Sequence, residues 1–168
     1  MHSSSRHPFL GSGRRCREYA ADLGDPTLAI ESRAMDLKPV GLFAEMSDGD
    51  LKKLGKQMRE VRHPRGAKPV LRGKDGVGFM VILEGQAEVS TVDGRHRLLG
   101  PGDHFGEMAL LDQQGRSADI TVRTDMVAAA IPEWEFKEFL SNHPEVAYRL
   151  LQTLSRRLRE AEEARENR

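Results

Sequence analysis

The sequence contains little cysteine, no excess of charge of either sign and no long hydrophobic run. Cys16 is the single cysteine among 168 residues, which excludes an internal disulfide and favours a reducing cytoplasm as the compartment. The 26 Lys and Arg residues balance 26 Asp and Glu residues, which argues against a surface that coats nucleic acid. The longest apolar stretches, at 79–83 and 126–131, are far shorter than the roughly 20 residues that a membrane span needs. We therefore expect a soluble, cytoplasmic protein whose partners include neither nucleic acid nor a membrane.

Motifs typical of catalysis and of metal binding are missing as well. The sequence contains no nucleophile elbow, no P-loop and no paired acids within a supporting motif. Its six histidines are scattered, without the spacing of metal ligands such as H-x-H or H-E-x-x-H. We expect His104, which borders a glycine turn, to be an exposed turn residue. The sequence therefore predicts a protein that is not an enzyme and holds no metal or cofactor.

Length and composition predict one domain with a tail at each end. A chain of 168 residues suits one domain with a proper core and some extra length. Residues 1–34 contain serine and glycine runs, five arginines, no lysine and no sustained apolar period, which predicts a flexible tail. Met35 is a candidate initiator, which would make the preceding stretch an over-called start; a genuine disordered tail is the alternative. We place the folded domain at 36–160 and the charged end of its last helix at 161–168.

A helix is predicted ahead of the first glycine-rich region. Ser47 and Asp50 have the three-residue spacing of a capping box at a helix N-terminus. Pro64 and Gly66 are expected to close this helix. The apolar residues that recur near helical spacing, and so predict one buried stripe, are Leu51, Leu54, Met58 and Val61.

The middle of the chain, from about 67 to 131, has the pattern of short strands. Apolar runs alternate with glycine, Asp93-Gly94 marks a hairpin, and 100–103 is a second turn. Pro132 is expected to stop the last strand. Short strands about 8–12 residues apart are typical of an antiparallel barrel or jelly roll. We predict a mainly β fold, an antiparallel β-roll of the double-stranded β-helix or jelly-roll kind, flanked by an N-terminal helix and C-terminal helices.

The C-terminal part is predicted to be helical on both sides of His143-Pro144. Phe136, Phe139 and Leu140 precede this pair, and beyond Leu158 the sequence becomes rich in Arg and Glu. The residues between predict one apolar face, which we interpret as part of the core or as a dimer seam: Ala147, Leu150, Leu151, Leu154 and Leu158.

The candidate site lies within 102–111 and 115–118. Gly106 permits close backbone approach and unusual dihedral angles, and a short helix after it would present unpaired N–H groups to an anion. Arg116 can give a phosphate two charge-assisted hydrogen bonds, and Ser117 adds a hydroxyl donor. Glu107 would repel a phosphate, so its carboxylate suits hydroxyl groups such as those of a ribose. A phosphate together with ribose hydroxyls indicates a nucleotide.

The stretch 42–158 resembles the cyclic nucleotide-binding domain of bacterial catabolite activator proteins, kinase regulatory subunits and nucleotide-gated channels. The segments 105–110 and 116–118 are similar to the phosphate-binding cassette of that family, and 73–85 fits its β2–β3 turn and strand. Pro101-Gly102-Asp103 fits as well. The resemblance covers roughly 115 to 120 of the 168 residues and matches in order and spacing.

The resemblance implies roles for three side chains of the site, and backbone groups around Gly106, Ala109 and Ala118 would complete it. Arg116 matches the arginine that binds the cyclic phosphate, and Glu107 matches the glutamate that binds the ribose 2′-OH. Ser117 at its position is similar to the catabolite activator pattern and favours cAMP, whereas a threonine there is associated with cGMP; cGMP remains possible. The predicted ligand-binding residues are Phe105, Gly106, Glu107, Met108, Ala109, Arg116, Ser117 and Ala118.

The resemblance also implies a mechanism, in which the ligand shifts a conformational equilibrium. Met108 or Leu111 would move, and the C-terminal helix would dock over the base. About ten residues follow Leu158, too few for a helix-turn-helix, so we expect a stand-alone sensor acting through an effector protein or a homodimer. One alternative is a structural or interaction module that keeps the fold with little nucleotide affinity. The other is a transcription regulator of the catabolite activator type that lacks its DNA-binding domain.

Overall fold

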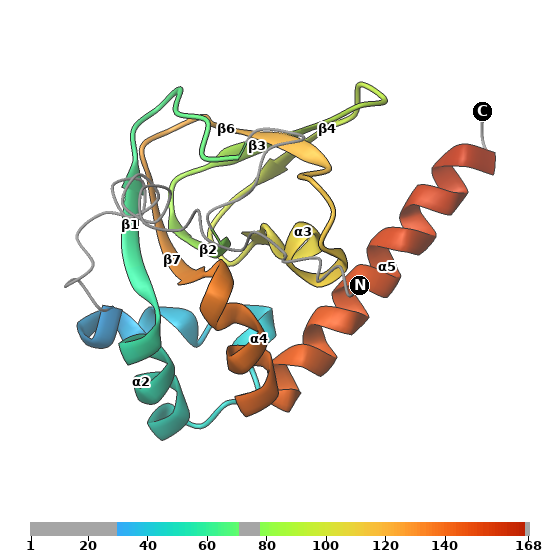
Figure 1. Ribbon diagram of the computed structural model, residues 1–168. Coiled ribbons are helices and arrows are strands. Elements are labelled where there is room, and N and C mark those ends of the chain that lie inside the picture. The colour runs from blue at the N-terminus through green and yellow to red at the C-terminus, as the bar shows by residue number, and fades with distance from the viewer. Residues whose placement is uncertain (1–29, 71–77, 167–168) are drawn as a thin grey trace, which may run out of the picture.

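In the computed structural model the chain is described at residues 30–70 and 78–166 (Figure 1). The sequence-based predictions for the segments outside these ranges, including the part of the 73–85 segment before Gly78, lie outside the described residues. In chain order the elements are η1 (Ile30–Leu37), η2 (Gly41–Phe43), α2 (Asp48–Gln57), β1 (Arg59–His63), β2 (Gly78–Glu84), β3 (Ala87–Thr91), β4 (His96–Leu99), β5 (His104–Phe105), α3 (Glu107–Asp112), β6 (Ala118–Val122), β7 (Met126–Pro132), α4 (Glu133–Asn142) and α5 (Pro144–Glu166).

The strands form two antiparallel sheets, which confirms the predicted β-roll. One sheet has the order β1-β7-β2-β5 and the other the order β4-β3-β6. The predicted Asp93-Gly94 hairpin joins β3 to β4, and β7 ends at Pro132 as expected. In Figure 1 the strands form the upper part of the molecule, and η1, α2, α4 and the start of α5 lie below them.

The two central strands, β2 and β7, separate two apolar cores by the alternation of their side chains. Phe79 and Val81 of β2 and Ile131 of β7 belong to the core shared with the helices. Met80 and Ala130, their neighbours along the strands, belong to the core inside the roll. Because successive side chains on a strand point to opposite faces, these central strands bury both of their faces.

The predicted N-terminal helix exists, but it is shorter than expected. The Ser47 side chain accepts a hydrogen bond from the Asp50 amide at 3.1 Å, so the predicted cap at the N-terminus of α2 is confirmed. The helix ends at Gln57, and Met58 already has extended backbone angles. Val61, predicted on the helical stripe, lies instead on β1 opposite Ala128 of β7. Pairing with β7 gives the 59–63 backbone its hydrogen bonds, and this outweighs the helical spacing of the apolar residues.

Ile30, Arg33 and Ala34, which the sequence assigned to the flexible tail, contact the domain. Ile30 and Ala34 are each 1% exposed, and the Ile30 amide donates to the Met58 carbonyl at 3.3 Å. Arg33 forms an ion pair with Glu84 at 2.6 Å. Leu37, near the end of η1, is fully buried as well. The folded part therefore begins no later than Ile30 rather than at 36.

We expect Ile30→Ala to lower the free energy of unfolding by about 2 kcal/mol, because it removes a buried side chain and leaves a cavity. Val92→Ala is the matched control, since Val92 is 76% exposed and its truncation should change stability by less than about 0.5 kcal/mol. Urea denaturation measures both. Equal stability of the two variants would show that Ile30 does not contribute to the core.

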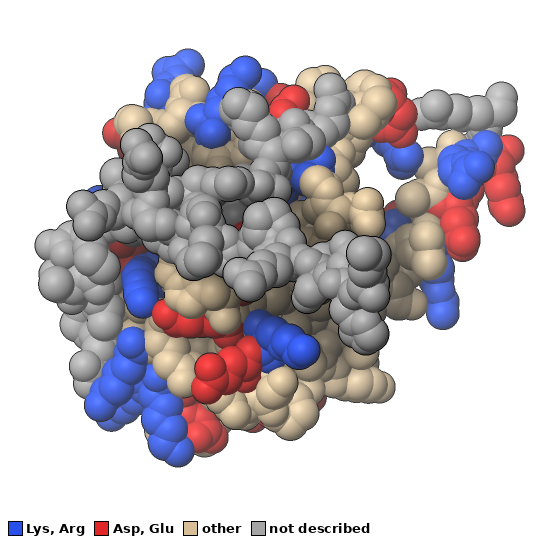
Figure 2. Space-filling view, in the orientation of Figure 1, with Lys and Arg blue, Asp and Glu red and all other residues tan. Residues whose placement is uncertain are grey.

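The N-terminal half of α5 packs against the domain, up to Leu154, which is partly buried against the core shared with the helices. Val146 and Leu150 are buried, whereas Leu151 and Leu158 are 63% and 60% exposed. The predicted single apolar face is therefore divided into a buried part and an exposed part. The C-terminal half of α5 projects from the body of the molecule (Figure 1), and Figure 2 shows both acidic and basic side chains along it. Among residues 30–70 and 78–166, no helix combines the length and the apolar character needed to cross a membrane.

Candidate functional site

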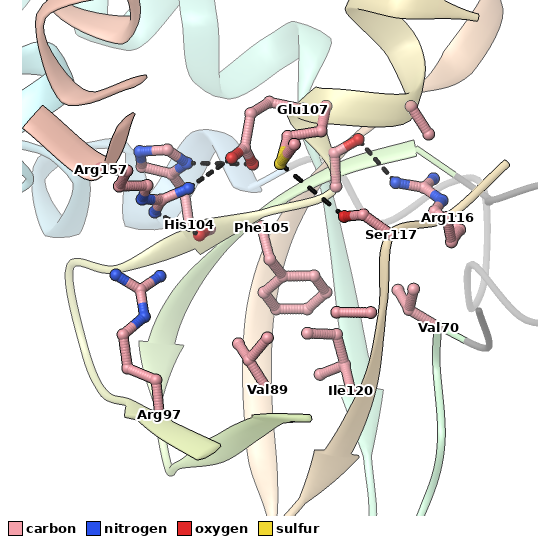
Figure 3. Close-up of a pocket in the computed structure, with 14 residues that line it drawn as sticks. Val70, Val89, Arg97, His104, Phe105, Glu107, Arg116, Ser117, Ile120 and Arg157 are labelled. Carbon is pink, nitrogen blue, oxygen red and sulfur yellow. Dashed lines mark hydrogen bonds and ion pairs between the residues drawn. The ribbon is translucent and has the colours of Figure 1, made fainter. Parts of the chain in front are cut away.

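A pocket of about 460 Å³, including the solvent at its mouth, lies between the roll and α5. The structure places every predicted site residue on its wall: Phe105, Gly106, Glu107, Met108, Ala109, Arg116, Ser117 and Ala118. The remaining lining residues were not predicted: Val70, Val89, Arg97, His104, Ile120 and Arg157. Figure 3 shows Arg116 and Ser117 at one end of the pocket and Glu107, His104 and Arg157 at the other.

Gly106 makes the sharp junction between β5 and α3. Its φ of 97° lies in the left-handed region, and a Cβ placed on it would stand 2.4 Å from the Gly78 carbonyl oxygen and 3.0 Å from Nη1 of Arg116. A side chain at this position is therefore disfavoured both by the backbone conformation and by its neighbours. The glycine allows the start of β2, the first turn of α3 and Arg116 to meet at one point.

Arg116 is held at this junction by backbone carbonyls. It lies in the segment between α3 and β6, yet it is only 4% exposed. Its Nη1 donates to the Gly106 carbonyl at 2.6 Å and its Nη2 donates to the Gly78 carbonyl at 3.3 Å. These bonds fix the direction of a guanidinium group, whose planar fork of donors suits phosphate oxygens. The exposed Ser117 hydroxyl lies close by and contacts Sδ of Met108 at 3.7 Å.

Glu107, the first residue of α3, is a buried carboxylate shared by two partners. It is 2% exposed, and Nη1 of Arg157 donates to its Oε1. Nδ1 of His104 lies 3.4 Å from its Oε2. Burial by itself raises the pKa of Glu107, but the hydrogen bond and charge of His104 and the charge of Arg157 outweigh burial and bring the pKa below its usual 4.5. The carboxylate is therefore ionised near neutral pH.

The prediction that His104 is an exposed turn residue was wrong. His104 lies on β5, pairs with Val81 of β2 and is 5% exposed. Its ring packs against Phe79 with the ring centroids 5.5 Å apart. Turn residues do surround it in the sequence, but the short pairing of β5 with β2 draws its side chain into the interior beside Glu107.

Arg157 is the residue that sequence reasoning missed most clearly. It lies 50 positions after Glu107 on a stretch of α5 that reads as a solvated, charged face. Its Nη2 also reaches the His104 carbonyl, at 3.4 Å. Nothing in the local pattern distinguishes it from Arg156, whose ion pair with Glu160 is exposed. Arg157, and not Arg156, reaches Glu107 because of the path that α5 takes across the mouth of the pocket.

The lowered pKa of Glu107 gives a pH dependence of stability. A carboxylate whose pKa is lowered by folding contributes stability that is fully present above its usual pKa of 4.5 and is lost as the pH falls through the lowered value. We expect the difference in unfolding free energy between the wild type and Glu107→Gln to shrink below about pH 4.5. Urea denaturation at several pH values measures this difference. A difference that stays constant through the acid range would contradict the ionised, paired state of Glu107.

The pocket combines a cation, an ionised acceptor and an apolar wall. Arg116 supplies the positive charge, Glu107 accepts hydrogen bonds, and Phe105, Val89 and Ile120 line the space between and below them (Figure 3). This arrangement complements a small molecule that has an anionic group, hydroxyl groups and an apolar or planar part. Within the described part of the chain, no group of three or more His, Cys, Asp or Glu residues is placed to hold a metal ion.

Residues 60–143 match the family described as "Cyclic nucleotide-binding domain". The "CRP-like cAMP-activated global transcriptional regulator" of Mycobacterium tuberculosis is 30% identical over 128 residues, which is 73% of this chain and 57% of that protein. The "cAMP-dependent protein kinase regulatory subunit" of Aspergillus niger is 29% identical over 106 residues, which is 62% of this chain and 26% of that protein. The crystal structure of the Thermus thermophilus catabolite activator protein is similar with a TM-score of 0.68 and 29% identity, covering 75% of this chain and 62% of that one. The chain spans less than two thirds of each of these proteins.

Proposed function

This chain belongs to the cyclic nucleotide-binding domain family, and we propose that it is a regulatory module that binds cAMP in the pocket between Arg116 and Glu107. The observation that carries the proposal is the placement of these two side chains at opposite ends of one pocket (Figure 3). The cyclic phosphate would lie at Arg116 and Ser117, and the ribose hydroxyls at Glu107. The base would lie against the apolar side chains, because a purine ring gains most from leaving water there.

The preference for cAMP over cGMP rests on Ser117 and on the relatives. Ser117 is the residue that the catabolite activator pattern has where a threonine is associated with cGMP. The two curated relatives described above carry cAMP in their names. We expect this chain to bind both nucleotides, with the higher affinity for cAMP.

We propose that nucleotide binding changes the position of α5. Arg157 of α5 is bonded to the carboxylate that we assign to the ribose hydroxyls, so a bound nucleotide and Arg157 would compete for Glu107. Binding would therefore change how α5 sits across the pocket, and α3, with Met108 and Leu111 about half exposed, has room to move with it. A ligand shifts such an equilibrium only by the difference in its affinity for the two states. The exposed Leu151 and Leu158 on α5 offer an effector protein or a second copy an apolar surface.

One observation favours the alternative of a module that keeps the fold with little nucleotide affinity. Both oxygens of Glu107 are already engaged, one by Arg157 and the other by His104. A ribose would have to displace or share these contacts, which lowers the net gain from binding. The two functions make different predictions for a direct titration.

Isothermal titration calorimetry of the full chain with cAMP and with cGMP tests the proposal. We expect saturable binding of one cAMP per chain and weaker binding of cGMP. Arg157→Gln, which removes the competing charge from Glu107, is expected to keep or raise the affinity. Absence of heat with both nucleotides, in the wild type and in Arg157→Gln, would exclude the regulatory module and leave the low-affinity alternative.

A further inference from the structure

A second cleft lies beside the nucleotide pocket, between α5 and the turn that joins β4 to β5. Four arginines line it: Arg97 from β4 and Arg149, Arg156 and Arg157 from α5. Asp103 is the one carboxylate among its described lining residues. The two cavities share a wall made of Arg97, His104 and Arg157. Arg116 and Ser117, to which we assign the cyclic phosphate, line only the first cavity.

The positive charges reach the cleft from opposite sides. Arg149, Gln152, Thr153 and Arg156 all line it, and their spacing of three, four and seven residues places them on one face of α5. Arg97 stands across from this face on β4. Figure 3 shows the Arg97 side chain directed toward the side where Arg157 and His104 lie. The cleft is therefore bounded by guanidinium groups on both walls, with the uncharged Gln152 and Thr153 between those of α5.

The acidic partners of Arg149 and Arg156 hold them weakly, whereas Arg157 is paired with the buried Glu107. Asp103 is used within its own turn, where it accepts a hydrogen bond from the Gly100 amide at 2.9 Å. Glu45, which pairs with Arg149, and Glu160, which lies 3.9 Å from Arg156, are both more than half exposed. Exposed ion pairs contribute little to stability and are screened by salt. A multiply charged anion can therefore replace them.

Several donors in this cleft lack an acceptor. The Arg97 side chain forms no hydrogen bond or ion pair with the described residues, and burial, followed by the charge of Arg157, lowers the pKa of Arg97. The Nε atoms of Arg149 and Arg157 are buried, and neither has a hydrogen-bond partner in the described part of the chain. Buried N–H donors are almost always bonded in folded proteins. Both of these Nε atoms belong to arginines that line the cleft.

We propose that this cleft binds a small polyanion that carries at least two phosphate groups, at a site separate from that of the cyclic nucleotide. Guanidinium groups bind phosphate oxygens in pairs, and a diphosphate can engage Arg97 on one wall and the arginines of α5 on the other. The position of the cleft, between a helix and a turn, suits a small molecule. An anion held there would tie α5 to β4 and so fix the helix that carries Arg157.

Calorimetric titration of the full chain with inorganic pyrophosphate at low ionic strength tests this proposal. We expect one pyrophosphate per chain and at least tenfold weaker binding of orthophosphate. The double variant Arg149→Gln/Arg156→Gln should weaken pyrophosphate binding at least tenfold. The matched control is Arg159→Gln/Arg165→Gln, which removes the same charge from α5 outside the cleft and should leave the affinity within about twofold. Thermal melts confirm that both double variants are folded.

Three results would overturn the proposal. One is the absence of saturable binding, and another is equal weakening in the two double variants, which would indicate only general attraction to a basic helix. The third is pyrophosphate binding that is unchanged in Arg149→Gln/Arg156→Gln but is lost in Arg116→Ala, which would place the anion in the first pocket.

A parallel titration with ADP identifies the source of the diphosphate. Tighter binding of ADP would indicate a nucleotide, and tighter binding of pyrophosphate would indicate an inorganic ion. With either ligand, the proposal requires that Arg149→Gln/Arg156→Gln weakens binding. The result for this variant does not depend on whether the chain binds cAMP.

Discussion

Arg116→Ala is expected to weaken cAMP binding by about 2–4 kcal/mol, which is roughly a 30- to 1,000-fold loss of affinity. The substitution would remove the charge-assisted hydrogen bonds that we propose Arg116 makes to the cyclic phosphate. It also removes the donors that hold the Gly106 and Gly78 carbonyls, so the junction around the phosphate site is loosened as well. Calorimetry measures the affinity of the variant and of the wild type.

The control for Arg116→Ala is Arg123→Ala. Arg123 follows β6, is 51% exposed in its side chain and pairs with Glu88 on the surface. Its replacement removes the same charge from the chain without touching the pocket, and the affinity for cAMP should change by less than about 0.5 kcal/mol. An Arg116→Ala protein that folds and binds cAMP as well as the wild type would refute the assignment of the phosphate site.

Gly106→Ala is expected to lower the free energy of unfolding by about 3 kcal/mol and to abolish measurable cAMP binding. The left-handed backbone at this position costs an alanine about 1–2 kcal/mol. A Cβ there would also stand 2.4 Å from the Gly78 carbonyl oxygen, and relieving that overlap costs about 1–3 kcal/mol more. Because a Cβ at this position would also stand 3.0 Å from Nη1 of Arg116, relieving the overlap would displace the proposed phosphate site. Urea denaturation measures the stability.

Gly100→Ala is the matched control for Gly106→Ala. A Cβ at Gly100 meets no atom within 4 Å, so this variant should be as stable as the wild type or slightly more stable. Equal stability of Gly106→Ala and Gly100→Ala would mean that the β5–α3 junction does not require a glycine.

The fold was predictable where a local signal and the tertiary contacts agree. The Ser47 cap and the Asp93-Gly94 hairpin have their own side-chain and backbone chemistry, so they form as the sequence indicates. Val61 shows the opposite case. Its helical spacing from Met58 is real, but the 59–63 backbone gains its hydrogen bonds from β7, about 70 residues later in the chain. A long-range strand pairing of this kind has no local signature.

The candidate site was predictable as one continuous motif and unpredictable where other elements reach it. The segments 105–109 and 116–118 hold their residues close together through a short helix and a short connection, so the pocket wall follows from the motif. His104 and Arg157 join the site because β5 pairs with β2 and because α5 crosses the pocket. The sequence presents one of them as a turn residue and the other as part of a charged helix face.

The zero net charge of the chain does not reveal how charges are arranged inside the pocket. Equal numbers of basic and acidic residues argue against a uniformly charged surface, and Figure 2 shows both kinds interspersed over one face of the molecule. Inside the pocket, however, Arg116 and Glu107 are buried and stand at opposite ends. Their charges cancel in the sum while each suits a different part of a nucleotide.

The most direct test of the central claim, that the pocket between Arg116 and Glu107 holds a cyclic nucleotide, is an amide NMR titration of the full chain with cAMP. We expect saturable shifts concentrated at the backbone amides of 105–109 and 116–118, with smaller changes along α5 as Arg157 and Glu107 rearrange. In Arg116→Ala the same additions should shift these amides much less, in keeping with the lower affinity. Saturable shifts that avoid both segments, or no shifts at any concentration of cAMP, would contradict the account.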